Sequence, residues 1–157
     1  MLVRLYDLPE SATLIEKLSR EGVRCRRAES YERRALVEFV RQRWPNWVDE
    51  TEAAFSHVPP TMFLAQRGAA VIGFAAYHAT RPGFFGPTGV DDAERGQGAG
   101  RTLLWLCLEA MRAEGYAYAI IGGVHGRESF YEESVGATVI AGSEPGIYGG
   151  SVSASGN

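Results

Sequence analysis

A glycine-rich turn between an expected strand and an expected helix is the feature that most constrains this fold. The segment reads Val90-Asp-Asp-Ala-Glu-Arg95-Gly-Gln-Gly98-Ala-Gly100-Arg-Thr-Leu-Leu104. Before it, residues 83–90 are expected to form a strand broken at Gly86-Pro87-Thr88-Gly89, because a proline cannot donate to the ladder. After it, apolar residues recur at helical spacing over 101–114. The first N–H groups of a helix lack intrahelical partners, so this junction suits an anion such as a pyrophosphate.

The spacing of the glycines excludes two common phosphate-binding motifs. The dinucleotide fingerprint Gly-x-Gly-x-x-Gly fails, because Arg101 stands where Gly96 and Gly98 require the third glycine. The nucleotide P-loop also fails, since Arg95 replaces its first glycine and Arg101 its lysine. At this point a glycine turn that binds no ligand remains an alternative.

Composition favours one ordinary globular domain. The chain has 157 residues, of which 45% are hydrophobic and 22% charged, so it can build its own core. We find no linker and no fixed-period repeat. We therefore expect a single domain over 1–157, with its core at about 23–148 and a flexible Gly/Ser-rich tail at 149–157. The net charge of −3 gives no electrostatic argument for a nucleic-acid partner.

Several features predict a cytoplasmic protein. Cys25 and Cys107 are too few for a disulfide framework, and we expect them to be reduced core thiols. The start of the chain lacks the pattern of a signal peptide, and no run of about 18 apolar residues occurs, so we expect no membrane contact. No cysteine pair has zinc-ligand spacing, and we expect no metal.

The remaining pattern predicts one domain that contains both helices and strands. Helices are expected at 11–21, 31–43, 49–56, 101–114 and 128–135. Strands are expected at 2–8, 23–28, 62–66, 70–80, 83–90, 116–123 and 137–140.

The glycine turn resembles the acetyl-CoA signature of the GCN5-related N-acetyltransferase (GNAT) superfamily, Arg/Gln-x-x-Gly-x-Gly/Ala. Arg95, Gly98 and Gly100 carry this match. The resemblance extends over about 61–140, where hairpin, broken strand, glycine turn and helix precede the pair Phe130-Tyr131 in the family's order.

The resemblance implies an α/β domain with a mixed, mostly antiparallel sheet flanked by helices. It also implies an N-acetyltransferase that uses acetyl-CoA as co-substrate. It implies direct transfer of the acetyl group, in a ternary complex, to the amine of a small molecule or peptide. It also makes a homodimer a reasonable expectation, because this fold often dimerises. The bulge in the broken strand would splay it from the strand at 116–123 and open a V-shaped slot.

The resemblance also implies roles for individual residues. The implied cofactor-binding residues are Thr88, Val90, Arg95, Gly96, Gln97, Gly98, Ala99, Gly100, Arg101 and Thr102. Backbone N–H groups from Gly96 to Thr102 would hold the pyrophosphate of CoA. The backbone from Thr88 to Val90 would pair with the pantetheine arm, and the N–H of Val90 or a neighbour would polarise the thioester carbonyl. Tyr131 matches the tyrosine that often protonates the departing thiolate; the alternative is a half-buried aromatic anchor.

The chain departs from the family pattern upstream of this tyrosine. The asparagine often found seven residues before it is here Val124, and the alanine four before it is Arg127. The segment Gly122-Gly123-Val124-His125-Gly126 would then contact the pantetheine arm through its backbone.

The general base of the family is also missing. The broken strand carries no glutamate, and the candidates elsewhere are His78, His125, Glu52 and His57. A water relay is the alternative to all of them. The missing base motivates a second hypothesis, a non-catalytic acyl-CoA-binding or regulatory module. A structural domain without a cofactor is the third hypothesis.

Aromatic side chains near the early helices and the broken strand are candidates for an acceptor pocket. They are Trp44, Trp47, Phe55, Phe84 and Phe85. Such a pocket would suit an apolar or cationic small molecule. A place in the hydrophobic core is the alternative for most of them.

Overall fold

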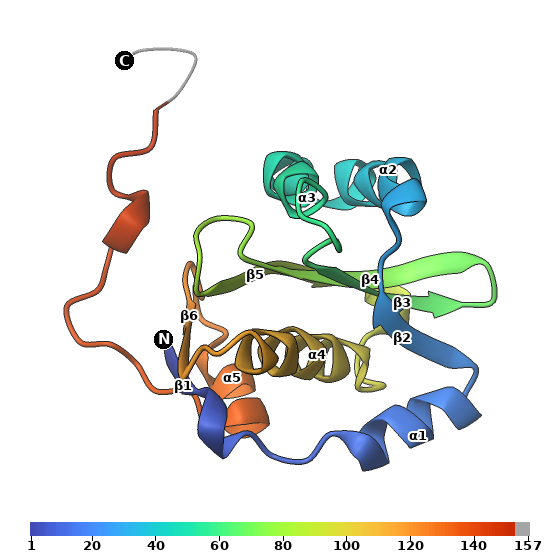
Figure 1. Cartoon of the computed structure of the whole chain (residues 1–157), viewed down its shortest axis with the longest axis horizontal. Helices are drawn as coiled ribbons and strands as arrows, with labels where there is room; N and C mark the ends of the chain where they lie inside the picture. Colours follow the sequence, from blue (N-terminus) through green and yellow to red (C-terminus); the bar gives the residue numbers. More distant parts are fainter. Residues whose placement is uncertain (153–157) are drawn as a thin grey trace.

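A six-stranded mixed sheet runs through the middle of the molecule, in the order β1-β6-β5-β4-β3-β2 (Figure 1). The computed structural model describes residues 1–152. The strands are β1 (Leu2–Arg4), β2 (Val23–Arg27), β3 (Met62–Arg67), β4 (Ala70–Tyr77), β5 (Phe84–Val90) and β6 (Tyr118–Ile121). Every neighbouring pair is antiparallel except β5 and β6, which are parallel. The predicted mostly antiparallel sheet is confirmed.

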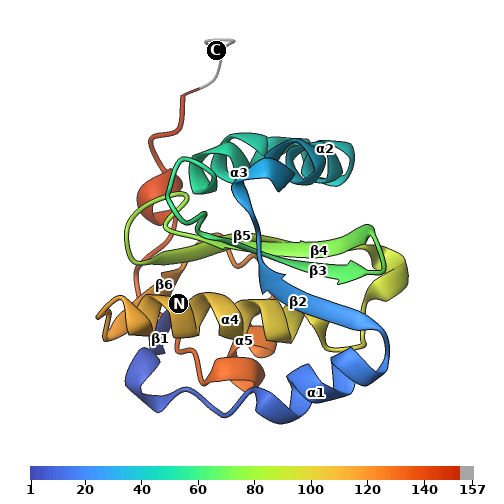
Figure 2. The same ribbon diagram turned by 45° about the vertical axis from the view of Figure 1, so that its right-hand side comes forward.

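Helices cover both faces of this sheet. They are α1 (Ala12–Arg20), α2 (Arg33–Arg43), α3 (Val48–Ala54), α4 (Ala99–Ala113) and α5 (Glu128–Val135). Figures 1 and 2 show α2 and α3 on one face, with α4 packed on the other and α1 and α5 beyond it. The helical spacing of apolar residues in α4 explains its place, since Leu104, Cys107, Leu108 and Met111 are all fully buried.

Each face of the sheet has its own hydrophobic cluster. The cluster under α4 contains Tyr77, Phe85 and Tyr131 together with the buried face of that helix. The cluster under α2 and α3 is built around Phe74, against which Trp44 packs with ring centroids 5.6 Å apart. The sheet therefore separates two hydrophobic clusters.

The N-terminal segment belongs to the core, which begins before residue 23. Val3 of β1 pairs opposite Ala119 of β6 and is fully buried. The N-terminal ammonium donates a hydrogen bond of 2.7 Å to the carbonyl of Ile121. The strand expected at 2–8 ends early, at Arg4, and continues as a 3-10 turn over Leu5–Asp7.

The strand predicted at 137–140 is wrong. Only one bridge forms there, between Leu2 and Thr138, with N···O distances of 2.8 and 2.9 Å. The reason is that β1 occupies the position beside β6, so this segment meets only the far edge of a three-residue strand, and Val139 is 62% exposed. Of the tail predicted at 149–157, residues 153–157 lie outside the described residues.

Candidate active site

The slot predicted between two strands corresponds to the point where β5 and β6 stop pairing. The parallel register contains only Phe84 opposite Ile120 and Phe85 opposite Ile121. Residues 88–90 of β5 pair with β4 beyond a register shift, but on the other side they have no strand partner. We keep the name "slot" for the space between residues 86–90 and the end of β6 at Gly122.

Backbone groups of β5 point into this slot. The N–H of Asp91 donates to the carbonyl of Ile72 on β4, at 2.8 Å. Bonded residues alternate along an antiparallel pair, so the N–H and C=O groups of Val90 and Thr88 point away from β4. The edge predicted to pair with a pantetheine arm is thus oriented toward the slot.

The glycine turn leads directly into α4 and leaves a run of backbone donors free. Gly98 precedes the helix with φ +102°, and Gly96 has φ +79°, conformations that favour glycine. Within residues 1–152, none of the six N–H groups from Gly96 to Arg101 donates to a protein acceptor. A Cβ at Gly96 would meet nothing within 4 Å, so the turn is open on that side. Six free donors at the N-terminus of a 15-residue helix form a site for an anion.

Two ion pairs anchor the turn from neighbouring elements. Arg43 of α2 pairs with Asp91 at 2.7 Å, and this contact is the main cause that lowers the pKa of Asp91. Arg67 of β3 pairs with Glu94 at 2.8 Å and donates to the side-chain oxygen of Gln97 at 3.1 Å. The Gln97 side chain therefore holds the turn in place, while its N–H remains free.

The two arginines of the signature differ in their environment. Arg95 is exposed, pairs with Asp92 at 2.7 Å and donates to the carbonyl of Val90 at 3.3 Å. Arg101 donates from Nε to Ser134 of α5 at 3.1 Å and has no carboxylate partner among the described residues. Arg101 thus keeps a net positive charge between α4 and α5.

Thr102 does not belong to the set of free donors. Its N–H donates to the carbonyl of Gly98 at 3.0 Å, as the first regular bond of the helix. Its hydroxyl is buried without a partner and faces a cavity of about 90 Å³ between α1, β2 and α4. Its predicted contribution to pyrophosphate binding is corrected on this ground, and the proposed set ends at Arg101.

The packing of α1 on the glycine turn could not be predicted from the sequence. A Cβ at Gly98 would lie 2.8 Å from Cδ1 of Leu14. Gly98 is therefore required both by its backbone conformation and by the close approach of α1. Residues this far apart in sequence share no local pattern that could have revealed the contact.

Tyr131 lies on the α4 side of the sheet, in α5. Only 9% of the residue is exposed, and its ring packs edge-to-face on Phe85 and Phe130, with centroids 6.3 and 5.1 Å away. No described residue hydrogen-bonds its phenol. Burial raises the pKa of Tyr131, so the phenol stays protonated at neutral pH and can act as a proton donor.

His78 is not a free base. The N–H of Gly83 donates to its Nδ1 at 3.0 Å, so the ring proton is on Nε2, which lies 2.9 Å from a carboxylate oxygen of Glu114. Tyr77 donates to the other oxygen of this carboxylate at 2.8 Å. These contacts place His78 in a structural network at the C-terminal end of α4.

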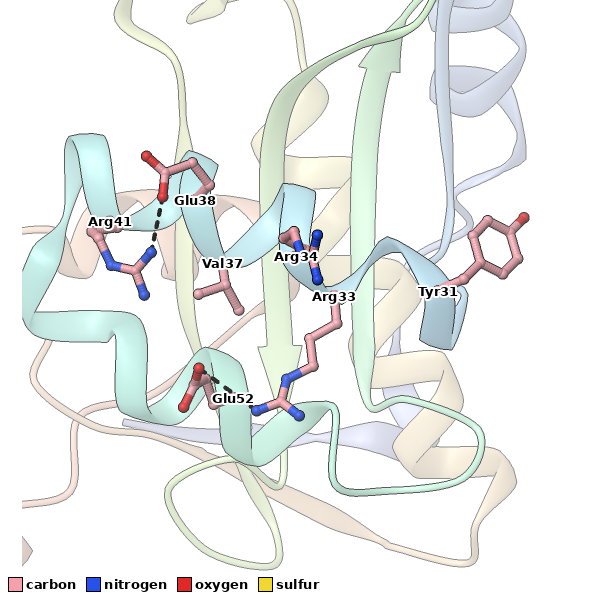
Figure 3. A pocket seen from close by; sticks show the side chains of 7 residues that line it. All are labelled: Tyr31, Arg33, Arg34, Val37, Glu38, Arg41 and Glu52. Carbon is pink, nitrogen blue, oxygen red and sulfur yellow. Dashed lines mark hydrogen bonds and ion pairs between the residues drawn. The ribbon is translucent and has the colours of Figure 1, made fainter.

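Of the other candidate bases, His125 lies beside the end of the slot, because its Nε2 would be 3.6 Å from a Cβ at Gly123. Both His57 and His125 are exposed. Glu52 pairs with Arg33 at 3.6 Å in a groove of about 490 Å³ on the outer side of α2 and α3 (Figure 3). The groove is lined by Tyr31, Arg33, Arg34, Val37, Glu38, Arg41 and Glu52. It lies on the face of the sheet opposite α4 and belongs to a different surface.

The aromatic candidates divide between the two faces. A Cβ at Gly89 would lie 2.7 Å from two ring atoms of Trp44, so this tryptophan covers β5 on the α2 side. Trp44 also stacks on Trp47, with centroids 5.7 Å apart. Phe85 faces α4 and belongs to that core, whereas Phe55 and Phe84 are partly buried. Of the five, only Phe85 is a buried core residue, whereas Trp44, Trp47 and Phe55 are partly buried against the cluster under α2 and α3.

Residues 1–152 contain neither a metal-binding cluster nor a membrane-spanning helix. No cluster of three or more His, Cys, Asp or Glu side chains there could hold a metal ion. None of the helices in this range has the length and apolar character needed to cross a membrane.

The fold and the turn together define an α/β protein of the acetyltransferase class. The family model of the Acetyltransferase (GNAT) family matches residues 17–137. The chain belongs to this family, whose members use acetyl-CoA. Among curated proteins, none matches this chain.

Solved structures share the fold at low sequence identity. One is a GCN5-related glucosamine N-acetyltransferase region in a fungal multi-domain GH3 β-N-acetylglucosaminidase, with a TM-score of 0.66 and 14% identity over 85% of this chain. This chain spans only 19% of that protein. Another is yncA of Salmonella typhimurium, solved with its cofactor acetyl-CoA, with a TM-score of 0.58 and 19% identity. There the match covers 76% of this chain and 82% of the other.

Proposed function

We propose that this protein is an acetyl-CoA-dependent N-acetyltransferase that works by direct transfer in a ternary complex. The observation that carries the proposal is the run of six free N–H groups from Gly96 to Arg101 beside the unpaired edge of β5. Family membership and the fold of yncA, solved with acetyl-CoA, support the choice of CoA as the anion. The acceptor would be the amine of a small molecule or peptide.

The residues of the chain bind and orient the co-substrate, which supplies an acetyl group activated as a thioester. The N–H groups of the glycine turn hold the pyrophosphate, and Arg95 and Arg101 add positive charge beside it. The N–H and C=O groups of Thr88 and Val90 pair with the pantetheine arm. The N–H of Val90 or a neighbour polarises the thioester carbonyl.

Proton transfer accompanies the exchange of bonds. A neutral amine forms the new N–C bond while the C–S bond breaks, and the thiolate takes a proton from the phenol of Tyr131. The proton lost by the amine leaves through water to solvent, and the phenolate regains a proton from the same source. No base on β5 is required by this scheme, in keeping with the absence of a carboxylate there.

Calorimetry and a thiol-release assay test the proposal. CoA should bind, and pantetheine, which lacks the pyrophosphate, should bind far more weakly. Thiol release from acetyl-CoA should depend on an added amine, and Tyr131→Phe should lower kcat about 100-fold with little change in CoA affinity. Absence of CoA binding at high micromolar concentration would overturn the proposal, and an unchanged rate would remove Tyr131 from it.

A non-catalytic acyl-CoA-binding module is the second candidate. It is favoured by the engagement of His78 with Gly83 and Glu114, which removes this imidazole from the set of free bases. Under this hypothesis CoA binds as above, yet no amine or peptide in a broad panel supports thiol release. A cytoplasmic location and a homodimer complete the proposal; gel filtration with light scattering tests the latter.

A further inference from the structure

The loop that follows β6 turns the chain sharply beside the slot. Gly123 at φ +62° and His125 at φ +44° both have left-handed backbone. The N–H of Arg127 donates to the carbonyl of Val124 at 3.2 Å and closes a turn around His125. A left-handed φ is uncommon for a residue with a side chain, and histidine is among the types that tolerate it. This turn directs the His125 side chain back toward the end of β6.

The imidazole of His125 has no partner in the described part of the chain. Its Nε2 would be 3.6 Å and its Cδ2 3.9 Å from a Cβ at Gly123, so the Nε2 edge of the ring faces that residue. His125 is exposed, and within residues 1–152 neither ring nitrogen has a hydrogen-bond or ion-pair partner. His78 differs, because Gly83 and Glu114 engage both of its nitrogens. His125 is thus the histidine beside the slot that can take a proton.

The same end of the slot carries the proposed proton donor. Ile121, two residues before Gly123, is the last residue of β6 that pairs with β5, opposite Phe85. The ring of Phe85 packs edge-to-face on that of Tyr131, in the cluster under α4. The phenol and the imidazole of His125 therefore both lie where the two strands part. Because Tyr131 is buried and His125 exposed, an amine that enters from solvent meets the imidazole first.

A second aromatic ring lies on the same two glycines. Tyr148, in the 3-10 turn at Gly146–Tyr148, packs on the end of β6. Its phenol oxygen would be 2.9 Å from a Cβ at Gly122, and its Cε2 3.8 Å from a Cβ at Gly123. Tyr148 and His125 therefore flank one point that glycine leaves open. Partial burial raises the pKa of Tyr148, so this phenol stays protonated at neutral pH and cannot accept a proton from an amine.

We propose that His125 is the general base that deprotonates the acceptor amine. The proposal rests on the proposed acetyltransferase function. The imidazole accepts a proton from the attacking nitrogen as the N–C bond forms and the C–S bond breaks, while the thiolate takes a proton from Tyr131. The exposed imidazolium then releases its proton to water, and the phenolate regains one from water. His125 thus takes the place of water as the first acceptor of the amine's proton.

Replacement of His125 by glycine tests the base, because glycine fits φ +44° and leaves room for an imidazole molecule. Thiol release from acetyl-CoA is measured with n-butylamine, benzylamine and lysine. With the best of these amines, His125→Gly should lower kcat about 100-fold, and added imidazole should restore the rate as its concentration rises. CoA affinity, measured by calorimetry, should be unchanged. The control is His57→Gly, which removes the exposed histidine after α3 and should have the wild-type kcat with no response to imidazole.

The outcomes separate failure of this inference from failure of the proposed function. A wild-type kcat in His125→Gly, or a loss that imidazole does not restore, would overturn the base role, while the rate of the wild-type protein would still support acetyl transfer. Loss of CoA binding in His125→Gly would assign the loop to the cofactor and overturn the base role as well. A wild-type protein that binds CoA but releases no thiol with any of the three amines would contradict both proposals.

Discussion

Replacing Gly98 with alanine should destabilise the protein through two effects that the structure separates. At φ +102° a side chain is strained, at a cost of about 1–3 kcal/mol. The added Cβ would also lie 2.8 Å from Cδ1 of Leu14, so α1 or this side chain must shift. Because Cδ1 is the end of a flexible side chain, we expect a total loss of about 2–4 kcal/mol. For a chain of this size, Tm should fall by about 4–16 °C.

Two further variants show which effect dominates, with thermal and urea unfolding as the assay. Leu14→Ala removes the close contact, so the double variant should lose about 1 kcal/mol less than the sum of the single losses. Gly100→Ala is the matched control: Gly100 has no left-handed φ, and its Cβ would be 3.5 Å from the nearest atom. It should be neutral or more stable by about 0.5–1 kcal/mol. Wild-type stability of Gly98→Ala, or strictly additive losses, would refute the packing of α1 on the turn.

Three other predictions concern the rest of the molecule. Gly89→Ala should cost about 1–3 kcal/mol and shift the tryptophan fluorescence, since its Cβ would lie 2.7 Å from the rigid Trp44 ring; unchanged unfolding would contradict that contact. A hydrogen bond from Arg26 holds the pKa of Glu32 below its ordinary value, so this pair stabilises the fold above the unfolded pKa of about 4.3 and the contribution is lost as pH falls through the lower folded pKa. Glu32→Gln should therefore cost about 1 kcal/mol at pH 7 and nothing in acid, whereas a loss independent of pH would exclude the ion pair as its cause. Burial raises the pKa of Cys25 to about 11 and also raises that of Cys107, so a thiol reagent at pH 8 should label the folded protein slowly and the unfolded protein fast; rapid labelling of both in the folded state would show that they are accessible.

The structural features that depend on neighbouring residues could be predicted from the sequence. The glycine turn is visible because left-handed φ values at Gly96 and Gly98 require glycine, and because α4 follows with a regular apolar spacing. The break in β5 is visible for a similar reason, since a proline interrupts the strand. The order of these elements was sufficient to predict the sheet and the family.

Contacts between distant segments could not be predicted in this way. Leu14 meets Gly98 and Tyr148 meets Gly122 through tertiary packing, for which no periodicity or motif exists. The strand at 137–140 was predicted from its run of apolar residues. In the structure, however, β1 pairs with β6 at this edge of the sheet. The ring nitrogens of His78 contact Gly83 and Glu114. The turn at Gly83 and the end of α4 at Glu114 meet only in the folded protein, so these contacts could not be predicted either.

The backbone amide spectrum tests the central claim most directly. In ¹⁵N-labelled protein titrated with CoA, the N–H resonances of residues 96–101 should show the largest shifts, because these groups gain a charged acceptor that they lack in the free protein. The N–H of Thr102, already bonded to Gly98, should shift less. Pantetheine should leave the turn unchanged while shifting residues 88–90. Large shifts elsewhere, with residues 96–101 unmoved by CoA, would contradict the site.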